Sequence, residues 1–200
     1  MDDIQFDVLT EIGNIGAGNA TTALSQLIDT KVDMNVPKVE MLTFTEFAEL
    51  VGGAENLVAG ILLSLEGDVD GMMMFVVESK AAHMLVNQLM GLGSPSDVNN
   101  KDFSDIEESA LKEIGNIIAG AYLSSISSLT NMLITSSVPY LAVDMAGAIF
   151  SVPAIEFGKM GDKALLIESR FTDLDVDISG YFILIPTLES YNKMLKSLGL

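Results

Sequence analysis

The sequence repeats one segment at a fixed distance along the chain. "LTEIGNIGAGNATTALSQL", which begins at Leu9, is matched by "LKEIGNIIAGAYLSSISSL", which begins at Leu111, so the offset is 102 positions. Between residues 4–28 and 106–130, 11 of 25 aligned positions are identical. Such a repeat indicates an internal duplication, in which each half forms the same supersecondary unit. We therefore expect a fold with two related halves.

Each half shows the same order of predicted elements. Apolar residues at helical spacing predict a long helix, which is followed by a strand near a proline, a short helix, a hairpin and a closing helix. Asp2 and Asp3, or Ser104 and Asp105, are candidate caps and first-turn acids of the long helices. The expected ranges are about 4–28, 43–51, 57–67, 69–77 and 78–91 in the first half, with the two outer helices at about 104–129 and 187–198 in the second.

The predicted fold class is α+β. Strands that neighbour in sequence favour antiparallel pairing, so we expect an antiparallel sheet packed with the two long helices. One domain is expected over residues 1–200, made of two repeats at about 1–92 and 103–200 that are related by a pseudo-two-fold axis. The connector, about residues 90–102, is rich in loop-forming residues. The second half is about seven residues longer, and 148–162 is the expected place of that gain.

The composition restricts the partners of the chain. With 28 acidic against 10 basic side chains, the net charge is −18, which repels nucleic acids and anionic lipid headgroups. Because cysteine is absent, a disulfide framework, a thiolate nucleophile and a cysteine-ligated metal are excluded. The acidic N-terminus does not resemble a secretory signal, and no apolar run approaches the roughly 20 residues of a membrane span. We expect a cytoplasmic protein that neither binds nucleic acid nor inserts into membranes.

Three glycines in "EIGNIGAGNA", residues 11–20, raise the question of a phosphate-binding loop. The P-loop pattern fails because Asn19 and Ala20 stand where Lys and Ser or Thr are needed, and the dinucleotide fingerprint fails because no strand precedes the glycines. The second copy also carries Ile118 in place of Gly16. Nucleotide binding is therefore not expected. Within a helix each glycine costs about 1 kcal/mol relative to alanine, which suggests a packing or functional reason for them.

A polar strip runs beside the apolar face of each long helix. A helix advances about 100° per residue, which places the strip next to the face formed by the isoleucines. Gly18 and Gly120 lie in the middle of their strips, where a missing side chain leaves room for another surface to approach. The strip residues are Asp7, Glu11, Asn14, Gly18 and Ser25 in the first copy, and Ser109, Glu113, Asn116, Gly120 and Ser127 in the second.

Two interpretations of the strip compete. A Glu and an Asn three residues apart are ordinary on a solvated helix face. However, the two copies have diverged at most surface positions and still share Glu-Ile-Gly-Asn-Ile. Core geometry explains the isoleucines and the first glycine, but it does not explain the polar residues. The duplication therefore favours a functional role for Glu11, Asn14, Glu113 and Asn116.

Both halves satisfy the pattern [DS]-x3-E-x2-N-x22-P at full spacing. The matching residues are Asp7, Glu11, Asn14 and Pro37, then Ser109, Glu113, Asn116 and Pro139. With this motif, the chain resembles the CheC/CheX/FliY family of bacterial chemotaxis phosphatases, and the duplicated arrangement covers essentially its whole length. The resemblance implies hydrolysis of the aspartyl phosphate on the response regulator CheY. It also implies that the Asn orients the attacking water and that the Glu contacts a lysine of the regulator.

The chemistry of phosphoryl transfer is compatible with such a site. An acyl phosphate is already activated and the regulator is expected to supply Mg²⁺ and lysine, so we expect no cofactor and no metal in this chain. A carboxamide donates and accepts hydrogen bonds at once, as the orientation of a water requires. No nucleophile is needed, and His83, the only histidine, is expected to be a helix-face residue rather than a base.

The sequence leaves several assignments open. We interpret Pro37 and Pro139 as fixing the entry of the chain into a strand. Asp7 and Ser109 either orient the Glu one turn on or stay solvated. The alternative function is a non-catalytic chemotaxis module that binds phosphorylated CheY and regulates CheD, the receptor deamidase that the resemblance adds as a partner. Residues 138–150 are either a CheD surface or a buried short helix. Because the duplication supplies internal symmetry, we expect a monomer.

Overall fold

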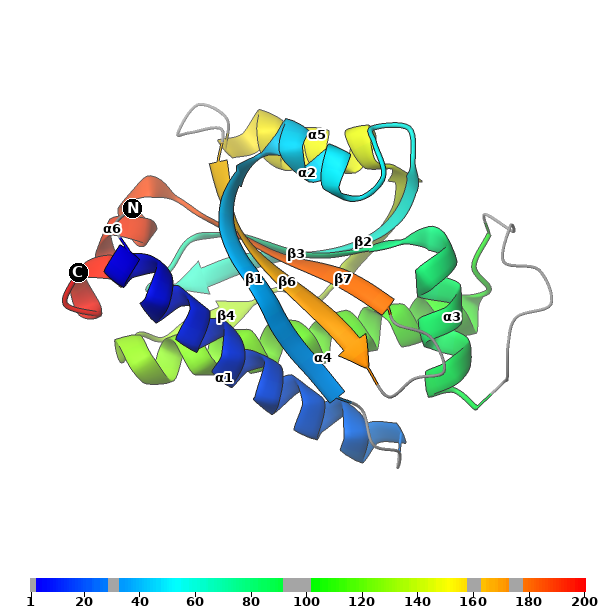
Figure 1. The fold of residues 1–200 in the computed structure, drawn as a ribbon, viewed down its shortest axis with the longest axis horizontal. Helices are drawn as coiled ribbons and strands as arrows, with labels where there is room; N and C mark the ends of the chain where they lie inside the picture. Colours follow the sequence, from blue (N-terminus) through cyan, green and yellow to red (C-terminus); the bar gives the residue numbers. More distant parts are fainter. Residues whose placement is uncertain (1–2, 29–32, 92–101, 158–162, 173–177) are drawn as a thin grey trace.

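The computed structural model describes residues 3–28, 33–91, 102–157, 163–172 and 178–200, and within them it contains six helices and seven strands (Figure 1). The first half holds α1 (Asp3–Ile28), β1 (Asp33–Thr43), α2 (Phe44–Leu50), β2 (Leu57–Gly67), β3 (Gly71–Glu78) and α3 (Ser79–Leu89). The second half holds α4 (Asp105–Thr130), β4 (Ile134–Ser136), β5 (Tyr140–Met145), α5 (Ala146–Phe157), β6 (Lys163–Thr172), β7 (Ile178–Pro186) and α6 (Leu188–Ser197). The predicted long helices, short helix, hairpin and closing helices are thus confirmed.

The seven strands form one antiparallel sheet in the order β1-β6-β7-β3-β2-β4, and β5 also pairs with β2. The first strand of each half pairs with the other half, because β1 lies beside β6 while β4 and β5 take successive parts of β2. The halves meet where β3 pairs with β7. The predicted α+β class with an antiparallel sheet is confirmed. The repeat boundaries stay a prediction, because residues 92–101 of the connector lie outside the described residues.

Helices cover both faces of the sheet. α1, α3, α4 and α6 contribute to the core on one face, and α2 and α5 to the core on the other (Figure 1). Residues of β3 alternate between the two cores, with Met73, Phe75 and Val77 on the first and Met72, Met74 and Val76 on the second. This double burial explains why "GMMMFVV" is apolar throughout instead of alternating with polar residues.

α1 and α4 run in opposite directions over the same face of the sheet and pack against each other (Figure 1). A Cβ built on Gly16 would overlap the ring of Tyr122, which stacks on Phe182 at a centroid distance of 4.2 Å. In the other copy the sizes are reversed: the buried Ile118 is equivalent to Gly16, and the buried Ala20 is equivalent to Tyr122. The loss of Gly16 in the second copy therefore reflects a small-against-large exchange in the helix interface.

The two prolines of the motif interrupt strand pairing in different ways. Pro139 lies between β4 and β5, directly before β5. Pro37 lies inside β1, four residues after its start at Asp33, where the register with β6 shifts between Asn35 and Lys38. The expectation of a proline at strand entry thus describes Pro139, whereas Pro37 lies at a bulge of an edge strand. Neither position requires a ladder hydrogen bond from the proline, which lacks a backbone N–H.

The second half gains length in α5, which has 12 residues where α2 has 7. The expected gain lies within 148–162, and residues 158–162 of it lie outside the described part of the chain. The segment 138–150 is not a buried short helix but β5 followed by the start of α5. Val138 and Tyr140 are exposed while Phe150 is buried. Among the helices in the described ranges, none combines the length and apolarity of a membrane span.

Candidate active site on the two long helices

The structure exposes the polar strip of each long helix. Of the ten strip residues expected from the sequence, eight are exposed, and Ser25 and Ser127 are half-buried. From here on the α1 strip means the exposed residues Asp7, Glu11, Asn14 and Gly18, and the α4 strip means Ser109, Glu113, Asn116 and Gly120. The neighbouring isoleucines, Ile12 and Ile114, are only 1% and 2% exposed. Because both helices bury their apolar faces on the same side of the sheet, both strips lie on the outer surface of one helical layer.

The glycines of the motif serve two separate purposes. A Cβ added to Gly18 or to Gly120 would meet nothing within 4 Å, so these glycines leave open space in the middle of each strip. Gly115 differs, because a Cβ there would lie 2.6 Å from Cγ2 of Ile61 on β2. It lets α4 approach the sheet closely. The division between clearance and packing agrees with the helical positions expected from the sequence.

The Glu and Asn side chains of the two strips project from their helices without internal restraint. In the described part of the chain, Glu11, Asn14, Glu113 and Asn116 make no hydrogen bond or ion pair, so their polar atoms are available to another molecule. The hydroxyl of Ser109 donates to the backbone carbonyl of Asp105 at 2.7 Å. Ser109 therefore satisfies its own helix backbone and does not hold Glu113.

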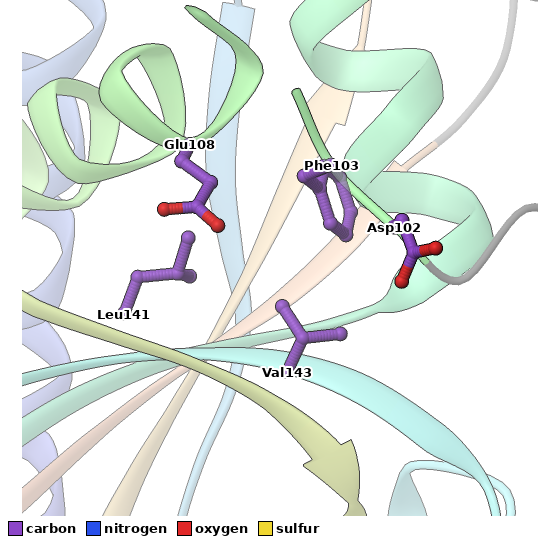
Figure 2. A pocket seen from close by; sticks show the side chains of 5 residues that line it. All are labelled: Asp102, Phe103, Glu108, Leu141 and Val143. Carbon is purple, nitrogen blue, oxygen red and sulfur yellow. The ribbon is translucent and has the colours of Figure 1, made fainter. Parts of the chain in front are cut away.

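The strips lie on exposed helix surface, away from the pocket that is formed at the N-terminus of α4. A pocket of about 280 Å³ lies between the N-terminus of α4 and β5, and its lining consists of Asp102, Phe103, Glu108, Leu141 and Val143 (Figure 2). It contains no residue of either strip. Protruding Glu and Asn side chains suit a site that inserts into the cavity of a partner, where bulk water is excluded and the reacting group is held.

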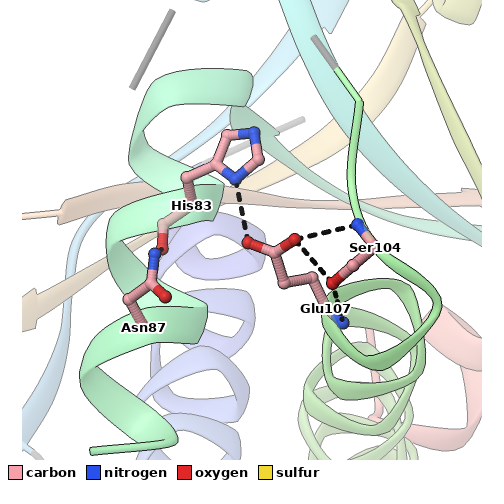
Figure 3. A network of polar contacts seen from close by, with 4 residues as sticks. All are labelled: His83, Asn87, Ser104 and Glu107. Carbon is pink, nitrogen blue, oxygen red and sulfur yellow. Dashed lines mark hydrogen bonds and ion pairs between the residues drawn. The ribbon is translucent and has the colours of Figure 1, made fainter. Parts of the chain in front are cut away.

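The N-terminus of α4 is held in place by two interactions. Ser104 and Glu107 form a capping box in which the Glu107 carboxylate accepts from the Ser104 backbone N–H at 2.8 Å. The other carboxylate oxygen lies 3.2 Å from Nδ1 of His83 on α3 (Figure 3). The His83 ring also stacks on Phe103. His83 is 4% exposed, so it lies on the buried face of its helix and serves structure. The Ser-x-x-Glu pattern at residues 104–107 is the signal that identifies this capping box.

The carboxyl of Glu107 has a lowered pKa. Desolvation raises it, but the hydrogen bonds from the Ser104 backbone and hydroxyl, together with His83, outweigh that effect and bring the pKa below the ordinary 4.5. Glu107 is therefore a firmly ionised anchor of the α4 N-terminus. Among the described residues, no group of three or more His, Asp or Glu side chains is arranged to hold a metal ion.

Comparison with known proteins places the chain in a family. The model of the CheC-like family matches residues 4–41 and 106–141, which contain both motifs. The chain is 35% identical over 198 residues to the CheY-P phosphatase CheC of Bacillus subtilis, covering 98% of this chain and 94% of that protein. It belongs to the CheC-like family. The matched motif segments begin in α1 and α4 and end in the strands that follow them.

Solved structures share the fold at lower identity. FliY from Thermotoga maritima superposes with a TM-score of 0.76 at 20% identity, over 100% of this chain and 98% of that one. A chain of the CheX–CheY–BeF3–Mg²⁺ complex from Borrelia burgdorferi superposes with a TM-score of 0.51 at 16% identity, over 85% of this chain and 95% of that one. At these identities the likeness establishes the fold of the CheC-like chain, whereas its chemistry depends on the residues of the strips.

Proposed function

We propose that this CheC-like chain is a phosphatase that hydrolyses the aspartyl phosphate of phosphorylated CheY at two sites, one on α1 and one on α4. The observation that carries the proposal is the duplicated exposure of a Glu and an Asn on the outer surface of the long helices. The 35% identity to the CheY-P phosphatase CheC of Bacillus subtilis supports the choice of substrate. The protein is thus a hydrolase whose substrate is another protein.

In each site the asparagine positions the attacking water. Asn14 and Asn116 are exposed and available, and a carboxamide oxygen accepts from the water while the amide N–H₂ donates to the phosphoryl group or its surroundings. Neither group has to act as a strong base, because an acyl phosphate needs an in-line water and stabilised charge more than proton abstraction. The contribution of the asparagine is orientation, which reduces the entropic part of the barrier.

The glutamate aligns the partner. Glu11 and Glu113 lie one turn before the asparagines on the same side of their helices, so a cation of the regulator that meets the carboxylate sets the depth and direction of the amide. A charge-assisted hydrogen bond of this kind is directional and stronger than a neutral one. We propose that the regulator brings Mg²⁺ to the site, while this chain supplies neither a metal nor a nucleophile.

Reversal of the glutamates tests the proposed docking. E11K/E113K is expected to lower kcat/KM for dephosphorylation of CheY-P by about 100-fold, because each new cation meets a cation of the regulator. The measurement is the decay of phosphorylated CheY with and without the variant, and K80T/K196T serves as a control for exposed charges outside the strips. An unchanged kcat/KM for E11K/E113K would remove the Glu–lysine contact from the mechanism.

We further propose that the chain acts as a monomer in the cytoplasm and that it binds the deamidase CheD through a surface separate from the strips. The internal symmetry of the fold supports the monomer, since both sites are present in one chain.

Exposed Val138 and Tyr140 on the second half make the segment around β5 the candidate CheD surface. Loss of CheD binding in V138D/Y140D, with phosphatase activity kept, is the expected result. Unchanged binding would place the CheD surface elsewhere.

A further inference from the structure

The two strips differ in charge around a common Glu–Asn pair. Asp7, one turn before Glu11, is replaced by Ser109 on α4, and Thr10 is replaced by Lys112. Asp3 and Asp105, further towards the N-termini, are equivalent and cancel in the comparison. α4 also carries Glu107 and Glu108 where α1 has Gln5 and Phe6, so the two helices have the same net charge. Glu107 is bound to Ser104 and His83, and Glu108 lies beside Lys112, so the difference is local to the strips. Since α1 contains no Lys or Arg, the α1 strip carries two carboxylates and no cation, whereas the α4 strip carries one carboxylate and has a lysine beside it.

Lys112 is placed to act on the chemistry of the α4 strip. It lies four residues before Asn116, so the two side chains are neighbours on the helix surface. Its Nζ lies 3.4 Å from Glu108 Oε2, and the two side chains are 39% and 45% exposed. An exposed i,i+4 pair of this kind is weak, so the ammonium group can turn towards an approaching anion. The equivalent of Glu108 on α1 is Phe6, so no such pair exists there.

Ser109 adds no charge to the α4 strip, and its hydroxyl is not available to bind an approaching group. Its hydroxyl is engaged with the Asp105 carbonyl of its own helix. Asp7, by contrast, is an exposed carboxylate at the matching position of α1. A phosphoryl group carries a charge of about −1.5 to −2, so an extra carboxylate opposes its approach and a nearby cation favours it.

From these differences we infer that the two sites are unequal and that the α4 site is the faster one, with Lys112 and Ser109 as the residues that determine the difference. The inference rests on the proposed function, because it concerns docking of the same phosphorylated protein. The charge difference changes the rate at which phosphorylated CheY associates with each site. It therefore appears in kcat/KM and in the salt dependence of kcat/KM, while kcat at saturation is nearly the same for the two sites.

Single-site variants measure the inequality directly. N116A leaves only the α1 site, and N14A leaves only the α4 site. With phosphorylated CheY as the substrate, N14A is expected to keep a kcat/KM about three to ten times that of N116A at low ionic strength. The ratio should fall towards one as salt screens the charges over a Debye length of about 10 Å at 0.1 M.

Exchange of the two charge-determining residues identifies the cause. D7S/T10K in the N116A background should raise kcat/KM of the α1 site, and S109D/K112T in the N14A background should lower that of the α4 site, each by about three- to tenfold. K80T/K196T removes two exposed lysines outside the strips, which is the same charge change as S109D/K112T, and it is the control with no change expected. Melting temperatures of all variants separate a change in docking from a loss of folded protein.

The outcomes separate this inference from the proposed function. If the unsubstituted chain does not accelerate the decay of CheY-P, the proposed function fails and the inference fails with it. Three results with an active chain would overturn only the inference: equal kcat/KM at the two sites, a higher kcat/KM at the α1 site, or a ratio of N14A to N116A that does not change with salt. A folded exchange variant that leaves kcat/KM unchanged also overturns it, because Lys112 and Ser109 would then not determine the difference.

Discussion

At the scale of single residues, the structure separates glycines that shape the core from glycines that shape the surface. Gly16 and Gly115 face Tyr122 and Ile61, while Gly18 has open space around it. The sequence predicted the open space at Gly18 from its place in the strip, and a core role for the first glycine of the motif, which is Gly115 in the second copy. It could not predict that Tyr122 is the reason for Gly16, since that contact joins residues 106 positions apart.

Because the space at Gly18 and Gly120 is open, small and large substitutions there should act on different properties: alanine on stability and leucine on activity. G18A/G120A should stabilise the fold by up to about 1 kcal/mol per site, because alanine is the better helix former and no atom obstructs its Cβ. G18L/G120L should keep the fold and lose at least about tenfold in kcat/KM, because the leucines occupy the clearance beside Asn14 and Asn116. Thermal unfolding and CheY-P decay measure the two effects, with G16A as the contrasting core variant.

G16A is expected to destabilise by about 1–3 kcal/mol, the usual cost of overpacking a core contact. If G18L/G120L retained full kcat/KM, the glycines would have no role in the approach of the partner.

At the scale of elements, local patterns predicted the helices and strands better than their contacts. The periodicity of residues 4–28 and 106–130 predicted α1, α4 and the exposure of both strips. The anchoring of α4 through His83 and Glu107 was not predicted, because it joins α3 to the first turn of a helix 24 positions further on. The position of Pro37 within β1 also depends on a bulge opposite β6, which no local pattern specifies.

The Glu107 anchor predicts a pH dependence of stability. Its pKa in the folded chain lies below the ordinary 4.5, so the ionised carboxylate stabilises the fold above that pH, and this stabilisation is lost as the pH falls through the lowered value. The free energy of unfolding of E107Q should therefore converge with that of the unsubstituted chain on acidification. Urea unfolding between about pH 3 and 7 measures the difference, with E108Q as the control on the same helix. A gap that stayed constant with pH would exclude ionisation of Glu107 as its source.

At the scale of the whole molecule, the duplication is expressed as one shared sheet. The sequence predicted two related halves, but the exchange of first strands between them depends on pairing across more than 100 residues, for example between Val39 and Ile167. This arrangement sets α1 and α4 side by side on one face, with a strip exposed on each. Both proposed sites therefore lie on one helical layer over a shared sheet, although the chain carries a net charge of −18 that offers no general attraction for a phosphorylated partner.

The proposed mechanism depends most directly on the two asparagines, so the decisive measurement is the decay of phosphorylated CheY in the presence of N14A/N116A. We expect the rate to fall to the spontaneous rate of CheY-P alone. N192A, a substitution of an exposed asparagine on α6, should keep full activity, and both variants should keep CheD binding. Decay that is still accelerated by a folded N14A/N116A chain would contradict the assignment of Asn14 and Asn116 as the residues that orient the attacking water.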